Sequence, residues 1–157
     1  MMQSPWFNPQ TIAWCQQLLN SYAYWTKNEL VERNGTSLVQ AQRLFDSEMV
    51  VVSHGVENDP VLNYGNQSAL ALWEMSWGQF TQTPSRLTAE PMNRKERSRM
   101  LTQAKNQGYI SDYQGVRISN SGKRFRVSNA IIWTVRDSDG ATVGQAAAFS
   151  NWQFLLD

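Results

Sequence analysis

The sequence contains one cysteine, one histidine and no long apolar run, and each scarcity excludes a class of protein. The single cysteine, Cys15, cannot form an internal disulfide. No C-x-x-C or H-x-x-x-H spacing is present, and a zinc site would need several carboxylates, so we predict no structural metal. No stretch approaches the roughly 20 apolar residues that span a bilayer. The N-terminus lacks the basic start and apolar stretch of a signal peptide. We therefore expect a soluble, cytoplasmic protein with no membrane partner.

The chain also has almost no excess of positive over negative charge. Lysine and arginine number 14 and aspartate and glutamate 13, for a net charge of +1, which creates no field that would concentrate nucleic acid. The most basic segment, Arg94 to Arg99, contains an internal acid, and we interpret it as a solvated helix face. We therefore expect no nucleic-acid partner. A chain of 157 residues is long enough for one core and too short for two.

An amphipathic helix is predicted at the N-terminus. Asn8 followed by Pro9 is typical of a helix start, because the asparagine caps a free N–H and proline needs none. Apolar side chains then recur at helical spacing, and burial among them makes Cys15 a packing residue. We expect the helix either to cover the outer face of a sheet or to meet its counterpart in a second chain. The predicted homodimer interface consists of Ile12, Leu18, Leu19, Tyr22 and Trp25.

The next segments alternate between helix and strand signals. Ser37 with Gln40 resembles a capping box and predicts a second short helix. The β-branched run Val50 to Val52 predicts a strand, and the turn residues Asn58 to Pro60 return the chain into a partner strand. Asn66 is well placed to cap a further helix that is rich in tryptophan.

Towards the C-terminus the apolar period changes from that of a helix to that of a strand. Apolar residues of one parity continue across Asn129 and predict one buried face, formed by Phe125, Val127, Ile131, Trp133 and Val135. Turn residues join three such strands as a meander. The whole pattern is helix, helix, strand, strand, helices and meander, which indicates an α+β fold with an antiparallel sheet.

Four runs of sequence resemble the MEKHLA domain, a PAS-related family found in small bacterial proteins and at the C-terminus of plant homeodomain–leucine zipper proteins. The runs are SHGVENDPVLNYGNQSALALWEMSW, TQTPSRLTAEPMNRKERSRML, GVRISNSGKRFRV and FSNWQF. The resemblance implies a PAS-like five-stranded antiparallel sheet of order 2-1-5-4-3, with helices across one face. It divides the chain into an N-terminal helical extension, residues 1–43, and a MEKHLA/PAS-like domain, residues 44–157. The family has no catalytic or binding residues that transfer position by position.

Aromatic residues are abundant, with seven tryptophans, and such rings either line a ligand cavity or fill a core. Asn129 and Gln145 are polar residues that interrupt otherwise apolar strands. His54, at the end of the first strand, is either hydrogen-bonded into the turn or paired with Asp59 as an acid–base couple. The candidate ligand-binding residues are His54, Trp73, Trp77, Asn129, Trp133 and Gln145.

These features favour a non-catalytic sensory or interaction module, with a possible small ligand between sheet and helices. The alternatives are a small enzyme using His54 and Asp59, or a structural module with a filled core. No cysteine lies in the region from Gln67 to Thr83, where flavin-binding relatives of the fold carry one, so covalent flavin photochemistry is excluded. The helix from Arg94 to Gln107 contains no histidine, which excludes heme ligation by that helix. The identity of any cofactor stays open.

Overall fold

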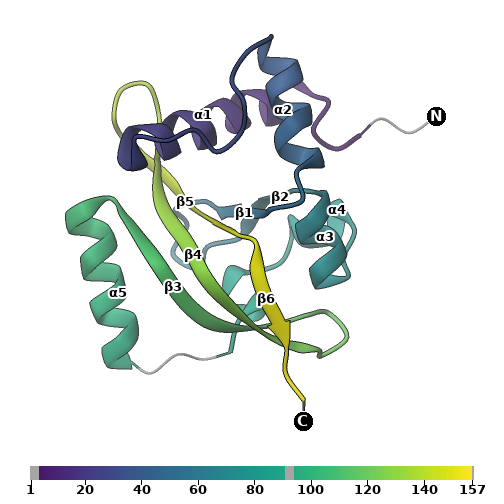
Figure 1. Ribbon diagram of the computed structural model, residues 1–157, viewed down its shortest axis with the longest axis vertical. Helices are drawn as coiled ribbons and strands as arrows, with labels where there is room; N and C mark the ends of the chain where they lie inside the picture. The colour runs from purple at the N-terminus through teal and green to yellow at the C-terminus, as the bar shows by residue number, and fades with distance from the viewer. Residues whose placement is uncertain (1–3, 91–93, 157) are drawn as a thin grey trace.

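The computed structural model describes residues 4–90 and 94–156 (Figure 1). The N-terminal half contains α1 (Pro9–Thr26), α2 (Ser37–Asp46), β1 (Val50–His54), β2 (Leu62–Gly65), α3 (Gln67–Trp73), α4 (Trp77–Phe80) and the 3-10 helix η1 (Ser85–Thr88). The C-terminal half contains α5 (Arg94–Gln107), β3 (Tyr109–Ile118), β4 (Arg124–Arg136), β5 (Thr142–Phe149) and β6 (Asn151–Phe154). The sequence also predicts a capping box for α5 from Asn93 with Glu96, and Asn93 lies outside the described residues.

All pairings between neighbouring strands are antiparallel, in the order β2-β1-β5-β4-β3. This order confirms the α+β, PAS-like architecture predicted from the sequence. β6 is an addition to it. β3 occupies one edge of β4, so β6 pairs with the other edge, which β5 also uses. The part of β4 that pairs with β6 runs from Phe125 to Ser128. β5 and β6 therefore follow β4 one after the other, with a break at Ser150.

Side-chain caps fix where the helices begin. The Asn8 side chain accepts a hydrogen bond from the Thr11 N–H at 2.9 Å, as its position before Pro9 predicts. α2 is capped by Thr36, whose hydroxyl accepts from the Val39 N–H at 3.2 Å. The predicted capping box at Ser37 and Gln40 is therefore wrong by one residue, since Ser37 is already the first helical residue.

Asn66 joins three elements at one buried point. Its Oδ1 accepts hydrogen bonds from the backbone N–H groups of Ala69 and Val51, each at 3.1 Å, so that it caps α3 and also holds β1. Its Nδ2 donates to the carbonyl oxygens of Leu44 at 3.1 Å and Met49 at 2.7 Å. The residue is fully buried, and these bonds offset the cost of burying its amide.

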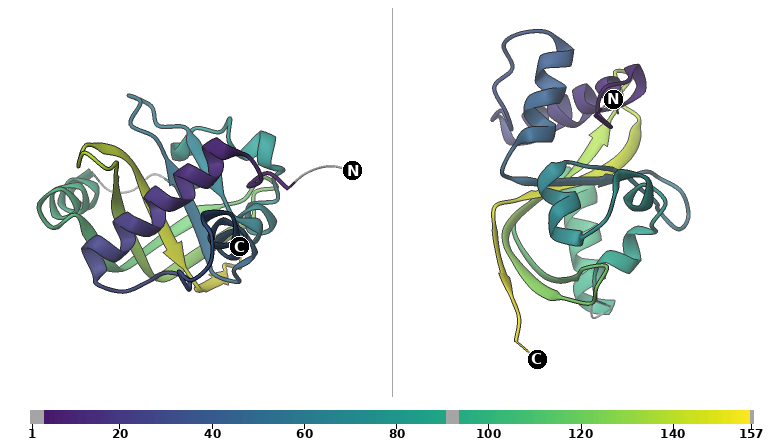
Figure 2. Two further views of the ribbon diagram at one scale, coloured as in Figure 1. Left: turned by 90° about the horizontal axis from the view of Figure 1, so that it is seen from above. Right: turned by 90° about the vertical axis from the view of Figure 1, so that its right-hand side faces the viewer.

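The N-terminal helix lies across the outer face of the sheet (Figure 2). Leu18 and Leu19 are fully buried there, and Tyr22 is 8% exposed. The indole of Trp133 donates to the Leu18 carbonyl at 3.2 Å. Of the two arrangements expected for the apolar stripe, the structure therefore shows the first, in which the helix covers its own sheet. The outer layer is formed by Trp6, Cys15, Leu18, Leu19, Tyr22, Ala41, Leu44, Phe45, Val51, Tyr64, Trp133, Val135, Ala146 and Ala148.

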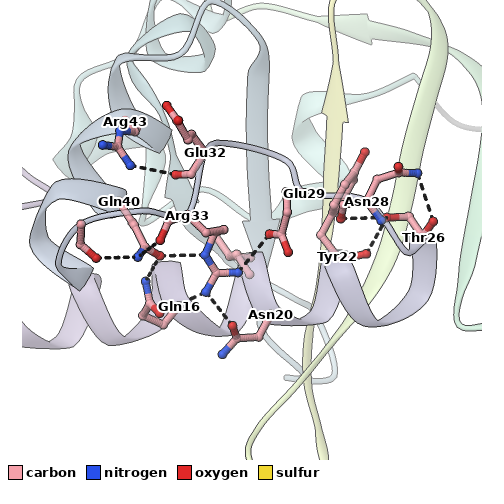
Figure 3. Close-up of polar contacts among 12 residues, drawn as sticks. Gln16, Asn20, Tyr22, Thr26, Asn28, Glu29, Glu32, Arg33, Gln40 and Arg43 are labelled. Carbon is pink, nitrogen blue, oxygen red and sulfur yellow. Dashed lines mark hydrogen bonds and ion pairs between the residues drawn. The ribbon is translucent and has the colours of Figure 1, made fainter.

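A polar network holds the connection between α1 and α2 (Figure 3). Arg33 donates to Asn20 Oδ1 and to Gln40 Oε1, each at 2.7 Å, and to Glu29 Oε2 at 3.3 Å. Gln40 in turn donates to the Arg33 carbonyl at 2.6 Å. The two N-terminal helices are thereby fixed to each other by side chains from the loop as well as by their apolar faces.

A bulge at Asn129 divides β4 between the two faces of the sheet. Val127 pairs with Gly115 and Ala130 with Tyr113, so β4 has one residue more than β3 at this point. Asn129 adopts φ +55, a left-handed conformation that asparagine tolerates at such bulges. The extra residue reverses the parity. Phe125 and Val127 face the inner layer, whereas Trp133 faces the outer layer, and the prediction that they share one face is wrong.

The inner face of the sheet packs against the remaining helices. Its buried residues are Val50, Leu62, Ala69, Leu72, Trp73, Phe80, Ala104, Ile110, Tyr113, Phe125, Val127, Ala130, Ile132 and Phe149. This layer does not fill the whole space between sheet and helices, and the remaining space forms the candidate site.

Candidate ligand-binding site

A cavity of about 860 Å³ lies between the inner face of the sheet and the segments that cross it. β1, β4 and β5 form its floor. Trp73 of α3, Phe80 of α4, η1 and Met100 of α5 contribute the opposite walls. The exposed turn from Gly55 to Pro60 also borders it and marks one end as open to solvent. A cavity of this size is within the range that small-molecule sites occupy.

The strand register arranges the floor of the cavity in rows. His54 pairs with Gln145, and Gln145 pairs with Thr134, so three polar side chains lie side by side on β1, β5 and β4. All three line the cavity and are partly exposed. We call these three residues the polar row. Since alternate residues of a strand share a face, the next row along the strands is apolar and consists of Val52, Ala147 and Ile132.

Trp73 anchors the apolar wall opposite the floor. Its ring is 2% exposed and makes edge contacts with Phe80, Phe125 and Phe149, at centroid separations of 6.0, 5.3 and 6.2 Å. Its indole N–H donates to the Thr88 carbonyl at 3.3 Å, which ties α3 to η1. Aromatic contacts of this kind add to the stabilisation from burial, so this wall is a fixed part of the cavity.

Tyr113 of β3 contributes another wall. It lines the cavity, and its hydroxyl is buried without a hydrogen-bond partner among the described residues. The ring extends along the strand over Gly115, where an added Cβ would lie 2.5 Å from the hydroxyl oxygen. The Arg117 guanidinium stands 5.4 Å from the ring centroid, in cation–π geometry. Gly115 therefore leaves the room that the Tyr113 side chain occupies.

His54 and Asp59 are not paired with each other, because each is bound to a different residue. The Nδ1 atom of His54 lies 2.8 Å from the Gly55 carbonyl oxygen. Because a carbonyl can only accept, Nδ1 carries the proton and Nε2 is the ring nitrogen left for other contacts. Asp59 accepts from Arg86 Nε, with both carboxylate oxygens at 3.2 Å. The structure thus agrees with a histidine hydrogen-bonded into the turn.

Three of the six candidate ligand-binding residues line the cavity, namely His54, Trp73 and Gln145. The structure places the other three elsewhere. Trp133 lies on the outer face under α1 because of the bulge, and Asn129, in the bulge itself, is exposed. Trp77 packs in the outer layer against Tyr64, with ring centroids 5.6 Å apart. Sequence reasoning missed Thr134, whose parity could be assigned only with the bulge known.

Cys15 is remote from the cavity, because it is fully buried in the outer layer on the opposite side of the sheet. Burial raises the pKa of its thiol to about 12, against the smaller opposing effect of the Tyr64 hydroxyl. The only cysteine of the chain therefore cannot reach a molecule held on the inner face.

Among residues 4–90 and 94–156, no three histidine, cysteine, aspartate or glutamate side chains form a group that could hold a metal ion. Within the same ranges, no helix combines the length and the hydropathy needed to cross a membrane.

Comparison with known proteins places this geometry in a family. The family model of the MEKHLA domain matches residues 12–154. The match begins within α1 and extends through β6. The comparison with curated protein sequences gives no match.

Solved structures with the same fold include sensory domains. A PAS domain from Colwellia psychrerythraea has a TM-score of 0.62 at 15% identity, covering 76% of this chain and 98% of its own. An RNA-binding light-oxygen-voltage receptor has 0.62 at 16%, covering 76% of this chain and 34% of its own. The light-state dimer of the fungal blue-light photoreceptor Vivid has 0.58 at 14%, covering 94% and 97%. At these identities the likeness shows the fold alone.

Proposed function

The chain belongs to the MEKHLA domain family, and from that premise we propose that it is a non-catalytic sensory module that binds a small amphipathic molecule between the sheet and the helices. The observation that carries the proposal is the cavity of about 860 Å³ with an apolar wall and one polar row. A few placed polar groups in an apolar pocket are typical of small-molecule sites. A purely structural module with a filled core is disfavoured by the same space.

The proposed signal passes from the cavity floor to α1. Trp14 of α1 donates to the hydroxyl of Ser53 at 2.9 Å, and Ser53 lies between two cavity-lining residues of β1. Trp25 donates to the Thr134 carbonyl at 2.8 Å, which connects α1 to a residue of the polar row. A ligand that favours one packing of α1 on the sheet shifts that equilibrium by its differential affinity for the two packings.

An enzymatic role for His54 and Asp59 is the less favoured alternative. Asp59 is bound by Arg86 and His54 by the turn, so neither side chain is arranged to activate the other. Fold alone does not confer an activity. We propose further that the module works in the cytoplasm and passes its signal by protein contact, without a nucleic-acid or membrane partner.

Native mass spectrometry of the protein purified from its own host tests ligand binding. We expect a retained small molecule in the natural protein and its loss in Ala147→Trp, where the indole fills the floor of the cavity. Ser150→Trp, at an exposed position between β5 and β6, is the matched control and should keep the molecule. A bare chain mass for the natural protein, with the same thermal stability in all three proteins, would overturn the proposal.

A homodimer remains part of the proposal, but Leu18, Leu19 and Tyr22 are buried within the chain's own core and cannot be its surface. The exposed side of α1, with Tyr24 at 54% exposure, is the remaining candidate. Light scattering of the full chain and of Tyr24→Glu tests this. A dimer that Tyr24→Glu converts to a monomer supports the surface, whereas a monomeric full chain contradicts the homodimer.

A further inference from the structure

We infer that the polar row selects an uncharged ligand head that carries a hydrogen-bond donor beside an acceptor, of the carboxamide or lactam type. This inference rests on the proposed function, since it assumes that the cavity binds a small molecule. It adds the chemical class of the ligand and the residues that hydrogen-bond to its polar head.

The hydrogen-bonding groups of the polar row are largely uncommitted within the chain. Several other polar side chains along the lining, by contrast, already have partners. Asp59 is bound by Arg86, Glu90 accepts from Arg124, and the Thr88 hydroxyl donates to the Ser85 carbonyl. The side chains of Gln145 and Thr134 make no hydrogen bond with another described residue.

These groups are also adjacent. Gln145 stands between His54 and Thr134 in register, and side chains opposite each other on neighbouring antiparallel strands lie within about 5.5 Å at their Cβ atoms. Partly buried polar groups that a folded protein leaves unpaired on the wall of a cavity are the groups a ligand can satisfy. Three neighbours in one row define one contact area on the ligand.

The chemistry of the row specifies the head. Because the Nδ1 proton of His54 is directed at Gly55, Nε2 is the ring position left for the ligand; in an imidazole with this tautomer Nε2 accepts, so the ligand must bring a donor. Gln145 offers an amide with both donor and acceptor, and the Thr134 hydroxyl offers either. A carboxamide or lactam presents a donor and an acceptor side by side, and it can bond the Gln145 amide in both directions at once. The apolar body of the ligand then extends over Val52, Ala147 and Ile132.

The surroundings of the row favour a head without charge. The nearby Asp59 and Arg86 form an ion pair with each other, so neither supplies a free counter-charge. Arg117 also lines the cavity, but it pairs with Phe125, near the opposite end of β4 from Thr134. Placing an ionised group in a partly buried site without a counter-charge beside it costs more than placing a neutral group there.

Three isosteric probes test the inference by titration calorimetry. They are naphthalene-2-carboxamide, which has donor and acceptor, 2-acetylnaphthalene, which has the acceptor only, and naphthalene-2-carboxylate, which is charged. We expect the natural protein to bind the carboxamide about tenfold more tightly than either of the others, which corresponds to about one well-formed hydrogen bond. Gln145→Leu should remove this preference, and the affinity for 2-acetylnaphthalene should fall by no more than the one hydrogen bond that its carbonyl accepts from Gln145. Retained binding of 2-acetylnaphthalene by this variant also shows that the cavity is intact.

Two further variants test whether the preference for the carboxamide depends on the polar row. Gln153→Leu, the same exchange at an exposed position of β6, should keep the full preference, and Thr134→Val should reduce it in part. Equal binding of the carboxamide and 2-acetylnaphthalene by the natural protein would overturn the inference while supporting the cavity. Tightest binding of the carboxylate would overturn the uncharged head. No binding of any probe, with Ala147→Trp indistinguishable from the natural protein, would overturn the proposed function and this inference together.

Discussion

Trp14 and Ser53 join the N-terminal helix to β1 by a side-chain hydrogen bond. The indole N–H of Trp14 donates to the Ser53 hydroxyl at 2.9 Å, and that hydroxyl donates in turn to Asn63 Oδ1 at 2.6 Å. Ser53 is 1% exposed; its hydroxyl contacts Trp14 of the outer layer, and the residue borders the cavity together with its neighbours Val52 and His54. The covering helix and the cavity floor therefore meet at one residue of one strand.

Replacing the donor in this bond should weaken the fold. Trp14→Phe keeps an aromatic ring and removes the N–H, so we expect a loss of about 1 kcal/mol in the free energy of unfolding. Urea denaturation followed by circular dichroism measures it. The control is Trp152→Phe, because Trp152 is 40% exposed and should change stability by less than about 0.5 kcal/mol. Equal losses in the two variants would show that ring size, and not the hydrogen bond, is responsible.

The fold could be predicted further than the site. The resemblance supplied the strand order, and local rules placed the caps at Asn8 and Asn66, because both depend on neighbours in sequence. The two faces of β4 could not be assigned, since one residue in a left-handed conformation at Asn129 reverses the alternation that a regular strand predicts. Because of this one bulge, Trp133 lies on the outer face and Thr134 lines the cavity.

The candidate site depended on contacts that a sequence does not display. His54 and Gln145 were chosen singly, as a histidine at a strand end and a polar interruption of an apolar strand. Their adjacency follows only from the register of β1 on β5, which is a long-range pairing. The covering of the sheet by α1 was expected as one of two arrangements, because an apolar stripe shows that a helix is covered and not by which chain.

The left-handed conformation at Asn129 limits which residues this position can hold. Asn129→Val places a β-branched side chain at φ +55, and we expect a loss of roughly 1–2 kcal/mol in the free energy of unfolding. Asn129→Gly should be tolerated, because glycine adopts this conformation readily. Ser128→Val is the control, since valine suits an ordinary strand position. If Ser128→Val lost as much stability as Asn129→Val, the cause would be side-chain size and not backbone conformation.

Cys15 should be chemically silent in the folded protein. Its pKa is raised to about 12 by burial, so very little reactive thiolate forms near neutral pH, and the residue is fully covered. We expect iodoacetamide to label it only when denaturant unfolds the chain, as followed by mass spectrometry. The control carries Cys15→Ala with Ser150→Cys, which moves the thiol to an exposed position and should be labelled at once. Fast labelling of the natural protein would show that α1 detaches from the sheet.

Glu74 should make the free energy of unfolding depend on pH in the acid range. Its carboxylate accepts hydrogen bonds from the hydroxyls of Ser121 and Ser119 and forms an ion pair with Lys123 at 3.3 Å. The hydrogen bond from Ser121 is the largest cause of a pKa lowered from 4.5 to about 2. These contacts join the end of α3 to the turn between β3 and β4.

A folded pKa below the unfolded one stabilises the fold at pH values above the unfolded pKa, and this contribution is lost as the pH falls through the folded pKa. The window for Glu74 therefore runs from about 4.5 down to about 2. The natural protein should be more stable than Glu74→Gln at neutral pH, and the difference should shrink through this window. Urea denaturation at a series of pH values measures it. Glu48→Gln, at an exposed position, is the control and should track the natural protein. A difference between the natural protein and Glu74→Gln that stayed constant from neutral pH to pH 2 would show that the carboxylate charge has no part in holding this turn.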